Sequence, residues 1–337
     1  MRLVLNKPGI FVGTRRGMIV VKEGGRKIAE VAPPQISRIV VTTRGATFSS
    51  ALLRLIARHK IPLIVLSGTG FPAVKLSSVR GGAVKLKKRQ YEAQSSWKAL
   101  YLAKRMAWGK VVNQKTLLYH AAKSRRRSQP EVAERLLAMA REISAVADRL
   151  RSLEANFADK GRAEIMRLEA EAAEVYWRGF RLLLPEGVEF TGRRKRFDKP
   201  KDPVNVMLNY CYGLLASEVL LAVEYTGLEP FIGFLHKDSS RRPALVMDLM
   251  EEFRQPVVDR VILRLLRSVD PGRLVEDERL TRKGRFELVK AFYGRLDERF
   301  TFRNRCLPVG DHILLQARRL AMFLLDKAPS YDPFVGR

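Results

Sequence analysis

The hydrophobic pattern changes its period once along the chain, near residue 80, and this change limits the folds open to it. Before that point, short apolar runs such as residues 10–14, 18–21 and 37–41 are separated by glycine and proline turns, which is typical of β-strands. After it, nearly every apolar pattern has the 3.6-residue period of an α-helix. We therefore predict an α+β protein with a small β-rich N-terminal domain followed by a larger all-α helical domain.

The boundary between these parts is basic and contains glycine, which is typical of a linker. We assign residues 1–84 to the β-rich domain, residues 85–96 to the linker and residues 97–337 to the helical domain. Within the first domain, residues 48–59 have helical spacing, with Thr47 as a possible N-cap. The longer helical patterns cover residues 97–112, 130–157, 163–184, 205–225, 244–269 and 312–325.

The charge balance points to a polyanionic partner. The chain has 63 Lys and Arg against 35 Asp and Glu, a formal net charge of +28. A surplus of this size favours binding to DNA or RNA. A thermophile's charged surface is the alternative, but such surfaces usually balance their signs in ion-pair networks.

Compartment and membrane signals are few. Cys211 and Cys306 are too few for a disulfide framework or a thiolate metal site, which fits a reducing cytoplasm. The N-terminus has no signal-peptide pattern, and no apolar run approaches the roughly 20 residues that span a bilayer. We expect a soluble cytoplasmic protein without a membrane partner.

Two arginine clusters interrupt the helical patterns. Residues 125–127 are either a solvated loop or a contact to a DNA backbone. The second cluster, at residues 193–196, contains Arg193, Arg194 and Arg196, and two lysines follow shortly. So many neighbouring cations repel one another unless they are solvated or pair with an anion. We therefore predict phosphate contacts at the second cluster.

One histidine and a group of helical carboxylates suggest a metal site. His236 precedes Asp248, Glu251 and Glu252 by 12 to 16 residues. Helical spacing places Asp248 within reach of both glutamates. Oxygen-rich ligation with one nitrogen suits Mg²⁺ or Mn²⁺, and arginines suit the phosphates that such a metal polarises. The flanking arginines include Arg241 and Arg242.

The same residues also allow a structural interpretation. Two glutamates beside an arginine on a helix usually form a solvated face, and a lone histidine is more often hydrogen-bonded than metal-bound. Helix geometry by itself does not choose between Glu251 and Glu252.

Four motifs resemble the CRISPR-associated endonuclease/integrase family, whose members are the catalytic subunit of the spacer-acquisition complex. The helix containing Glu169, Tyr176 and Trp177 is similar to the family's Glu-Gly-x-x-Ala-x-x-Tyr-Trp helix. Residues 200–210 are similar to its Pro-x-Asp-Pro-x-Asn-x-x-Leu-x-Tyr segment. Residues 227–236 and the Asp248-Leu-Met-Glu251 helix complete the set in the family's order. The resemblance extends over essentially the whole chain.

The resemblance implies a role for each matching residue. Glu169, His236 and Glu251 would be the metal ligands for Mg²⁺ or Mn²⁺, and Asp248 would support or share this catalytic site. Asn205 and Tyr176 would lie around the metal ligands or contact DNA. The residues implied to hold the DNA backbone are Arg193, Arg194, Arg196, Arg241 and Arg242.

The resemblance also implies an activity and partners. The enzyme would insert new spacers into a CRISPR array by attack of a 3′-hydroxyl on a repeat phosphodiester, acting on double-stranded or branched DNA. It would form a homodimer through the β-rich domain and assemble with a small CRISPR adaptation partner of ferredoxin-like fold. The alternatives are a non-catalytic basic DNA-binding scaffold and a standalone structure-specific nuclease.

Overall fold

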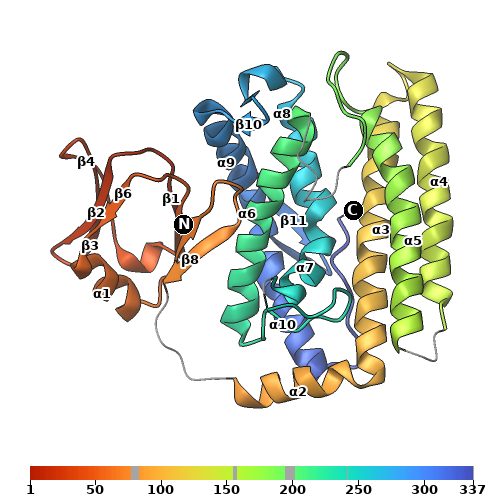
Figure 1. Ribbon diagram of the computed structural model, residues 1–337, viewed down its shortest axis with the longest axis horizontal. Coiled ribbons are helices and arrows are strands. Elements are labelled where there is room, and N and C mark those ends of the chain that lie inside the picture. The colour runs from red at the N-terminus through yellow and green to blue at the C-terminus, as the bar shows by residue number, and fades with distance from the viewer. Residues whose placement is uncertain (77–82, 155–157, 194–201, 241, 337) are drawn as a thin grey trace. The chain divides into compact units, whose positions relative to one another are not determined.

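The computed structural model describes residues 1–76, 83–154, 158–193, 202–240 and 242–336. The chain forms two compact units, Met1–Gly82 and Ala83–Arg337 (Figure 1). Strands dominate the first unit and helices the second, so the predicted α+β class is confirmed.

In its described residues, 1–76, the N-terminal unit contains two four-stranded sheets. One has the order β1-β5-β7-β8, with β8 antiparallel to its neighbour, and the other has the order β4-β3-β2-β6, with β6 parallel to β2. The strands are β1 (Arg2–Leu5), β2 (Ile10–Arg15), β3 (Met18–Glu23), β4 (Arg26–Val31), β5 (Arg38–Val41), β6 (Ala46–Phe48), β7 (Leu63–Leu66) and β8 (Pro72–Leu76).

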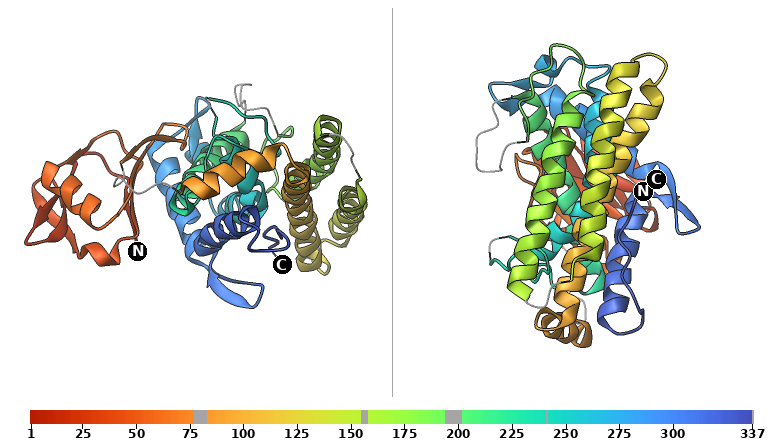
Figure 2. Two further views of the ribbon diagram at one scale, coloured as in Figure 1. Left: turned by 90° about the horizontal axis from the view of Figure 1, so that it is seen from below. Right: turned by 90° about the vertical axis from the view of Figure 1, so that its right-hand side faces the viewer.

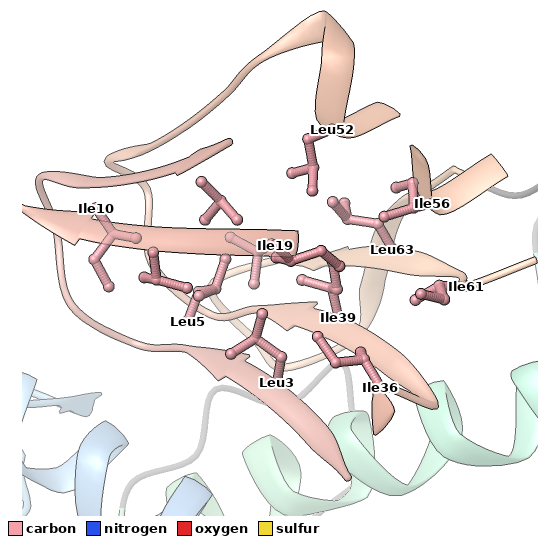
Figure 3. Packing of buried hydrophobic residues seen from close by; sticks show 13 residues of the cluster. Leu3, Leu5, Ile10, Ile19, Ile36, Ile39, Leu52, Ile56, Ile61 and Leu63 are labelled. Atoms are coloured by element: carbon pink, nitrogen blue, oxygen red, sulfur yellow. The ribbon is translucent and has the colours of Figure 1, made fainter. Parts of the chain in front are cut away.

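Branched aliphatic side chains from both sheets fill the core of this unit (Figure 3). Alternate residues of a strand point to one face, so Leu3 and Leu5 of β1 both enter the core. Helix α1 (Ser50–Arg58) adds Leu52 and Ile56, one turn apart. Its N-cap is Ser49, whose hydroxyl accepts a hydrogen bond from Leu52 N at 3.1 Å, so the predicted cap Thr47 is wrong.

Three long helices lie side by side in the second unit: α3 (Trp97–Arg125), α4 (Pro130–Ser152) and α5 (Ala158–Arg181) (Figures 1 and 2). The pattern predicted an end near residue 112, but α3 continues to Arg125 because apolar residues on its buried face recur as far as Ala122. Besides α2 (Val84–Gln94), the other α-helices in the described part of this unit are α6 (Pro203–Thr226), α7 (Ala244–Met250), α8 (Arg260–Leu265), α9 (Arg282–Asp297) and α10 (Val309–Leu324).

Helix α6 is the most apolar of the long helices described. Its length and composition would allow it to cross a membrane, but 83% of its most apolar window is buried within the protein. It packs against α7, α9 and α10 (Figure 1). These contacts make it a core helix of the second unit.

The predicted basic linker at residues 85–96 is largely helix α2 (Val84–Gln94). Gln90, which is completely buried, explains the difference. Its amide donates to the carbonyls of Glu229 and Ile232 and accepts from Glu229 N, all at 2.8–2.9 Å. Tertiary hydrogen bonds therefore hold a basic segment that reads as a linker in the sequence.

The apolar pattern of residues 244–269 predicts a helix that Pro256 kinks. The structure instead divides it into α7, a 3₁₀ turn (Glu251–Phe253), a π-helical segment (Arg254–Asp259) and α8. Proline has no N–H to donate to the carbonyl four residues earlier, so Pro256 interrupts the α-helical hydrogen bonds. The interruption lies in the π-helical segment.

Where the structure describes it, the second unit also contains two short hairpins, which the all-α prediction omits. One pairs β9 (Val275–Glu276) with β10 (Arg279–Leu280), and the other pairs β11 (Arg299–Phe302) with β12 (Arg305–Pro308). Residues at their turns have positive φ, including Arg303 and Asn304.

Candidate active site

Two of the predicted metal ligands, Glu169 of α5 and Glu251 of the 3₁₀ turn, meet at a lysine. The ammonium of Lys110, on α3, donates to Glu169 Oε1 and lies 2.8 Å from Glu251 Oε2. All three side chains are largely buried. Two carboxylates from distant segments thus share one cation inside the helical unit.

Arg254 provides a second cation for Glu251. Its guanidinium lies 2.8 Å from the other carboxylate oxygen, Oε1. Burial by itself would raise the pKa of Glu251, but the charges of Arg254 and Lys110 lower that pKa to about 2. Glu251 is therefore ionised at neutral pH.

Asp248 orients His236. Its Oδ1 lies 2.7 Å from His236 Nδ1 and accepts from the backbone N of the same residue at 2.9 Å. Its Oδ2 accepts from Phe234 N at 2.5 Å and Leu235 N at 3.0 Å. Both oxygens of this fully buried carboxylate are thus in use. Asp248 supports the His236 ring, and its hydrogen bonds leave no oxygen to share with a metal.

The loop that carries His236 is held from two sides. Gly233 packs so closely that an added Cβ would lie 2.8 Å from Ala244 Cβ and 2.9 Å from Asp248 Oδ2. Gln94 of α2 donates to the carbonyl of Gly233 and to Asp238. The helix in the predicted linker therefore helps to fix the position of the histidine.

His236 lies within electrostatic range of both glutamates. Burial lowers its pKa, but the hydrogen bond and charge of Asp248, followed by the charges of Glu251 and Glu169, raise it above the usual value. In the described part of the chain, however, no three histidine, cysteine or acidic side chains are grouped closely enough to hold a metal ion.

The chemistry of these residues nevertheless fits a divalent cation. Glu169 and Glu251 lie close enough together to share the single positive charge of Lys110. Glu251 Oε2 is buried and makes no directed hydrogen bond, although Lys110 pairs with it. Because Asp248 occupies Nδ1 of His236, Nε2 is the ring nitrogen left for a metal, an arrangement common around metal-bound histidines.

A buried aspartate adjoins this group. Asp259, at the end of the π-helical segment, accepts hydrogen bonds from Tyr176 and Tyr212, each at 2.6 Å. Burial raises the pKa of Asp259, and the two hydroxyls and the charges of Arg254 and Arg193 offset part of this rise. The resulting pKa is about 6, above the usual value for an aspartate. Tyr176 is fully buried and so holds Asp259 rather than reaching DNA.

Arg193 extends the site toward α6. Its guanidinium donates to Asn205 Oδ1 at 2.7 Å and Asn209 Oδ1 at 2.6 Å, and lies 5.3 Å from the centre of the Tyr212 ring. Asn205 is buried, and its amide also donates to Asp202, the N-cap of α6. Asn205 therefore positions Arg193 from inside the protein instead of contacting DNA itself.

The other predicted DNA-contacting arginines are less defined. Arg194, Arg196 and Arg241 lie outside the described residues. Arg242 is exposed at the end of the His236 loop.

The structure separates the two adjacent glutamates. Glu252 points toward the C-terminal segment, residues 331–336, and helix α10. It accepts hydrogen bonds from the Tyr331 hydroxyl, from Phe334 N at 2.7 Å and from Gln316 Nε2 of α10 at 2.7 Å. Glu251 points toward Lys110 and Arg254. Helix geometry leaves this choice open because the 3₁₀ turn, invisible in the sequence, sets the two directions.

Sequence reasoning missed several residues of this site, including Lys110, Arg254 and Asp259. Lys110 stands within a long helical pattern among many other lysines and arginines, and nothing local distinguishes it. Arg254 is, in the sequence, only one of several arginines that flank the acidic cluster. A clue to Asp259 was available, because an acidic residue inside an otherwise apolar helical stretch calls for buried partners.

Sequence comparisons place this chain in a known family. The family described as CRISPR associated protein Cas1 matches residues 3–293. The CRISPR-associated endonuclease Cas1 1 of Archaeoglobus fulgidus is 37% identical over the full length of both chains. The CRISPR-associated endonuclease Cas1 of Korarchaeum cryptofilum is 30% identical, covering 99% of this chain and 97% of the relative.

Solved structures support the same fold. A casposase bound to its integration product has a TM-score of 0.81 at 23% identity and covers 98% of this chain and 92% of its own. A Cas1 protein from Thermotoga maritima has a TM-score of 0.75 at 20% identity and covers 100% and 99%. The sequence matches confirm the resemblance carried by the four motifs, and the chain belongs to the Cas1 family of CRISPR-associated proteins.

Proposed function

We propose that this protein is a divalent-metal-dependent DNA endonuclease and integrase that inserts spacers into CRISPR arrays. The observation that carries the proposal is the convergence of Glu169 and Glu251 on one cation beside the oriented ring of His236. The endonuclease names of the full-length relatives support the reaction class. The casposase of similar fold, which is bound to an integration product, supports strand joining.

Glu169, Glu251 and Nε2 of His236 would hold Mg²⁺ or Mn²⁺. A metal at this position would neutralise charge on the scissile phosphate and lower the pKa of the attacking hydroxyl. The protein's own groups act around it. Asp248 fixes the ring of His236, and Arg254 keeps Glu251 ionised and in place.

Arg193 is the described arginine best placed to help hold the DNA backbone near these ligands. It is partly buried, and Asn205 and Asn209 hold its guanidinium in one orientation. A guanidinium fixed in this way loses little freedom when it binds a phosphate. We propose Arg242, at the exposed end of the loop, as a second phosphate contact, together with Arg194, Arg196 and Arg241 of the sequence prediction.

The partners are part of the proposal. We infer a homodimer formed through the β-rich unit and a complex with a small partner of ferredoxin-like fold. A solved Cas6-RT-Cas1–Cas2 complex, which contains a chain of this fold, supports assembly with a second adaptation protein. Light scattering of the isolated chain tests the dimer, and loss of the dimer when residues 1–82 are removed would assign it to the β-rich unit.

A strand-transfer assay tests the reaction. The substrates are a DNA fragment with free 3′-hydroxyls and a target that contains a CRISPR repeat, in the presence of Mn²⁺. We expect Glu169→Ala, His236→Ala and Glu251→Ala each to reduce joining by more than about 100-fold, because each removes a proposed metal ligand. Glu174→Ala is the matched control, since Glu174 is an exposed residue of the same helix as Glu169. Full activity in all three variants would refute the proposed site.

A further inference from the structure

Lys110 occupies the space between the two proposed carboxylate ligands. Its side chain is 12% exposed, compared with 17% for Glu169 and 2% for Glu251. Its ammonium contacts Oε1 of Glu169 and Oε2 of Glu251 from a rigid position on α3, the longest helix described. Lysine is rarely buried to this degree without charged partners.

The carboxylates need this charge. Glu169 and Glu251 would repel each other at close range in a buried setting, where solvent screens them poorly. Lys110 offsets that repulsion, because its ammonium lies against one oxygen of each carboxylate. In the absence of metal, the lysine therefore keeps the carboxylates together.

The same contact obstructs a metal ion. Arg254 already pairs with Oε1 of Glu251, so Oε2, the oxygen beside Lys110, is the one that remains for a metal. A divalent cation bound to Oε2 and to Glu169 would need the position of the ammonium and would be repelled by its charge. The two cations cannot both occupy the space between these oxygens.

We propose that Lys110 is an internal counter-cation that competes with the divalent metal for Glu169 and Glu251. This inference rests on the metal site of the proposed function. The lysine holds the site assembled without metal and weakens metal binding, because its ion pairs must break before the metal enters. Metal occupancy then requires that the Lys110 side chain leave the two glutamates.

Mn²⁺ titration of the full chain at fixed pH and ionic strength tests this competition. Free Mn²⁺ is measured by electron paramagnetic resonance, with wild type compared with Lys110→Met and Lys110→Gln. We expect both variants to bind Mn²⁺ at least roughly tenfold more tightly, since the competing charge is gone and the glutamates repel each other until metal binds. We also expect a lower metal-free melting temperature and a larger increase on adding Mn²⁺ than in wild type.

Lys98→Met is the matched control. Lys98 is also on α3, is 14% exposed and pairs with Asp326 at 2.5 Å, remote from the site in its contacts. The Lys98→Met variant should bind Mn²⁺ with the same affinity as wild type. The Gln variant retains a hydrogen-bond donor for Glu169, so it provides a folded neutral variant if Met destabilises the site.

The outcomes separate this inference from the proposed function. If wild type binds Mn²⁺ and the neutral Lys110 variants bind it equally or more weakly, the competition is refuted while the metal site stands. If neither wild type nor any variant binds Mn²⁺ stoichiometrically, the proposed metal site fails and the competition fails with it. Tighter binding in both neutral variants, with Lys98→Met unchanged, supports the inference.

Discussion

Glu251 and Glu252 are neighbours in the chain, yet their environments shift their pKa values in opposite directions. Burial raises the pKa of both carboxyls, but Arg254 and Lys110 lower that of Glu251 to about 2. Glu252 has only neutral donors in contact, Phe334 N, the Tyr331 hydroxyl and Gln316, and its pKa is raised to about 7. A charge beside a buried carboxyl offsets its desolvation better than neutral donors do.

Glu252 should make stability depend on pH. Its carboxyl has a pKa of about 7 when folded and 4.5 in the reference state, so the folded protein binds more protons between these values. The free energy of unfolding should therefore fall as the pH rises from 4.5 to 7, by up to about 1.4 kcal/mol per pH unit from this group. Urea denaturation of Glu252→Gln at several pH values should show a shallower fall.

Part of the slope should remain in that variant. The pKa of Asp259 is also raised, from 3.8 to about 6, and contributes with the same sign over a lower range. A Glu252→Gln profile as steep as that of wild type would contradict the assignment.

Asp248 should be intolerant of an isosteric change. In Asp248→Asn, an N–H₂ group replaces an oxygen that accepts from two N–H donors, whichever way the amide turns. We expect a loss of about 2–4 kcal/mol in the free energy of unfolding. Because the His236 ring loses its orientation, Mn²⁺ affinity should fall by about 10- to 100-fold. Calorimetry and Mn²⁺ titration measure the two effects, and an unchanged affinity would mean that Asp248 does not orient the ligand.

At the scale of elements, the site depends on a helix that is not regular. The 3₁₀ turn and π-helical segment between α7 and α8 turn Glu251, Arg254 and Asp259 toward partners on α3, α5 and α6. The C-terminal segment, residues 331–336, packs against this turn. Phe334 stacks on Phe253 with ring centres 4.8 Å apart, and Asn113 of α3 donates to the carbonyls of Glu252 and Phe334.

The C-terminal segment should therefore stabilise the turn that carries Glu251. Phe334 is fully buried, and Phe300, Phe302 and His312 also contact its ring. We expect Phe334→Ala to lower the free energy of unfolding by about 3–5 kcal/mol, because it leaves a cavity beside Phe253.

Phe286→Ala is the control for this change, since Phe286 is 40% exposed on α9. It should cost much less in the same denaturation experiment. Equal losses in the two variants would show that the C-terminal segment does not buttress the turn.

At the scale of the whole molecule, the net charge of +28 should dominate the encounter with DNA, the proposed substrate. Phosphate contacts release counterions, so DNA affinity should fall steeply with salt, by roughly 10³- to 10⁵-fold between 50 and 200 mM if six to ten phosphates are neutralised. Fluorescence anisotropy with labelled DNA measures this slope. Because Glu251 carries none of that attraction, Glu251→Ala should retain the slope while losing strand transfer. A salt-independent affinity would contradict the electrostatic account.

Local patterns were enough to predict the strand and helix regions, but they failed where tertiary contacts decide. Strands β2, β3, β4, β5 and β7 follow from short apolar runs between turns, and most of the long helices follow from the 3.6-residue apolar period. The short strands β1, β6 and β8 and helix α9 were not predicted. The prediction of a linker at residues 85–96 was wrong because Gln90 and Gln94 hold α2 through hydrogen bonds to a loop about 140 residues away. The ends of the 3₁₀ and π-helical segments were likewise not predictable, because Pro256 signals a break but not its form.

The sequence by itself determined the α+β class, the family and the electrostatic preference for a polyanion, because these depend on periodicity, motif order and total charge. Only the tertiary structure decided that Asp248 serves His236, that Glu252 faces away from Glu251, and that Lys110 lies between the two proposed carboxylate ligands. The physical reason is that the position and ionisation of a buried charged group depend on the groups that pair with it. Here those groups come from α3, α5 and the turn after α7, which are distant in the chain and adjacent only after folding.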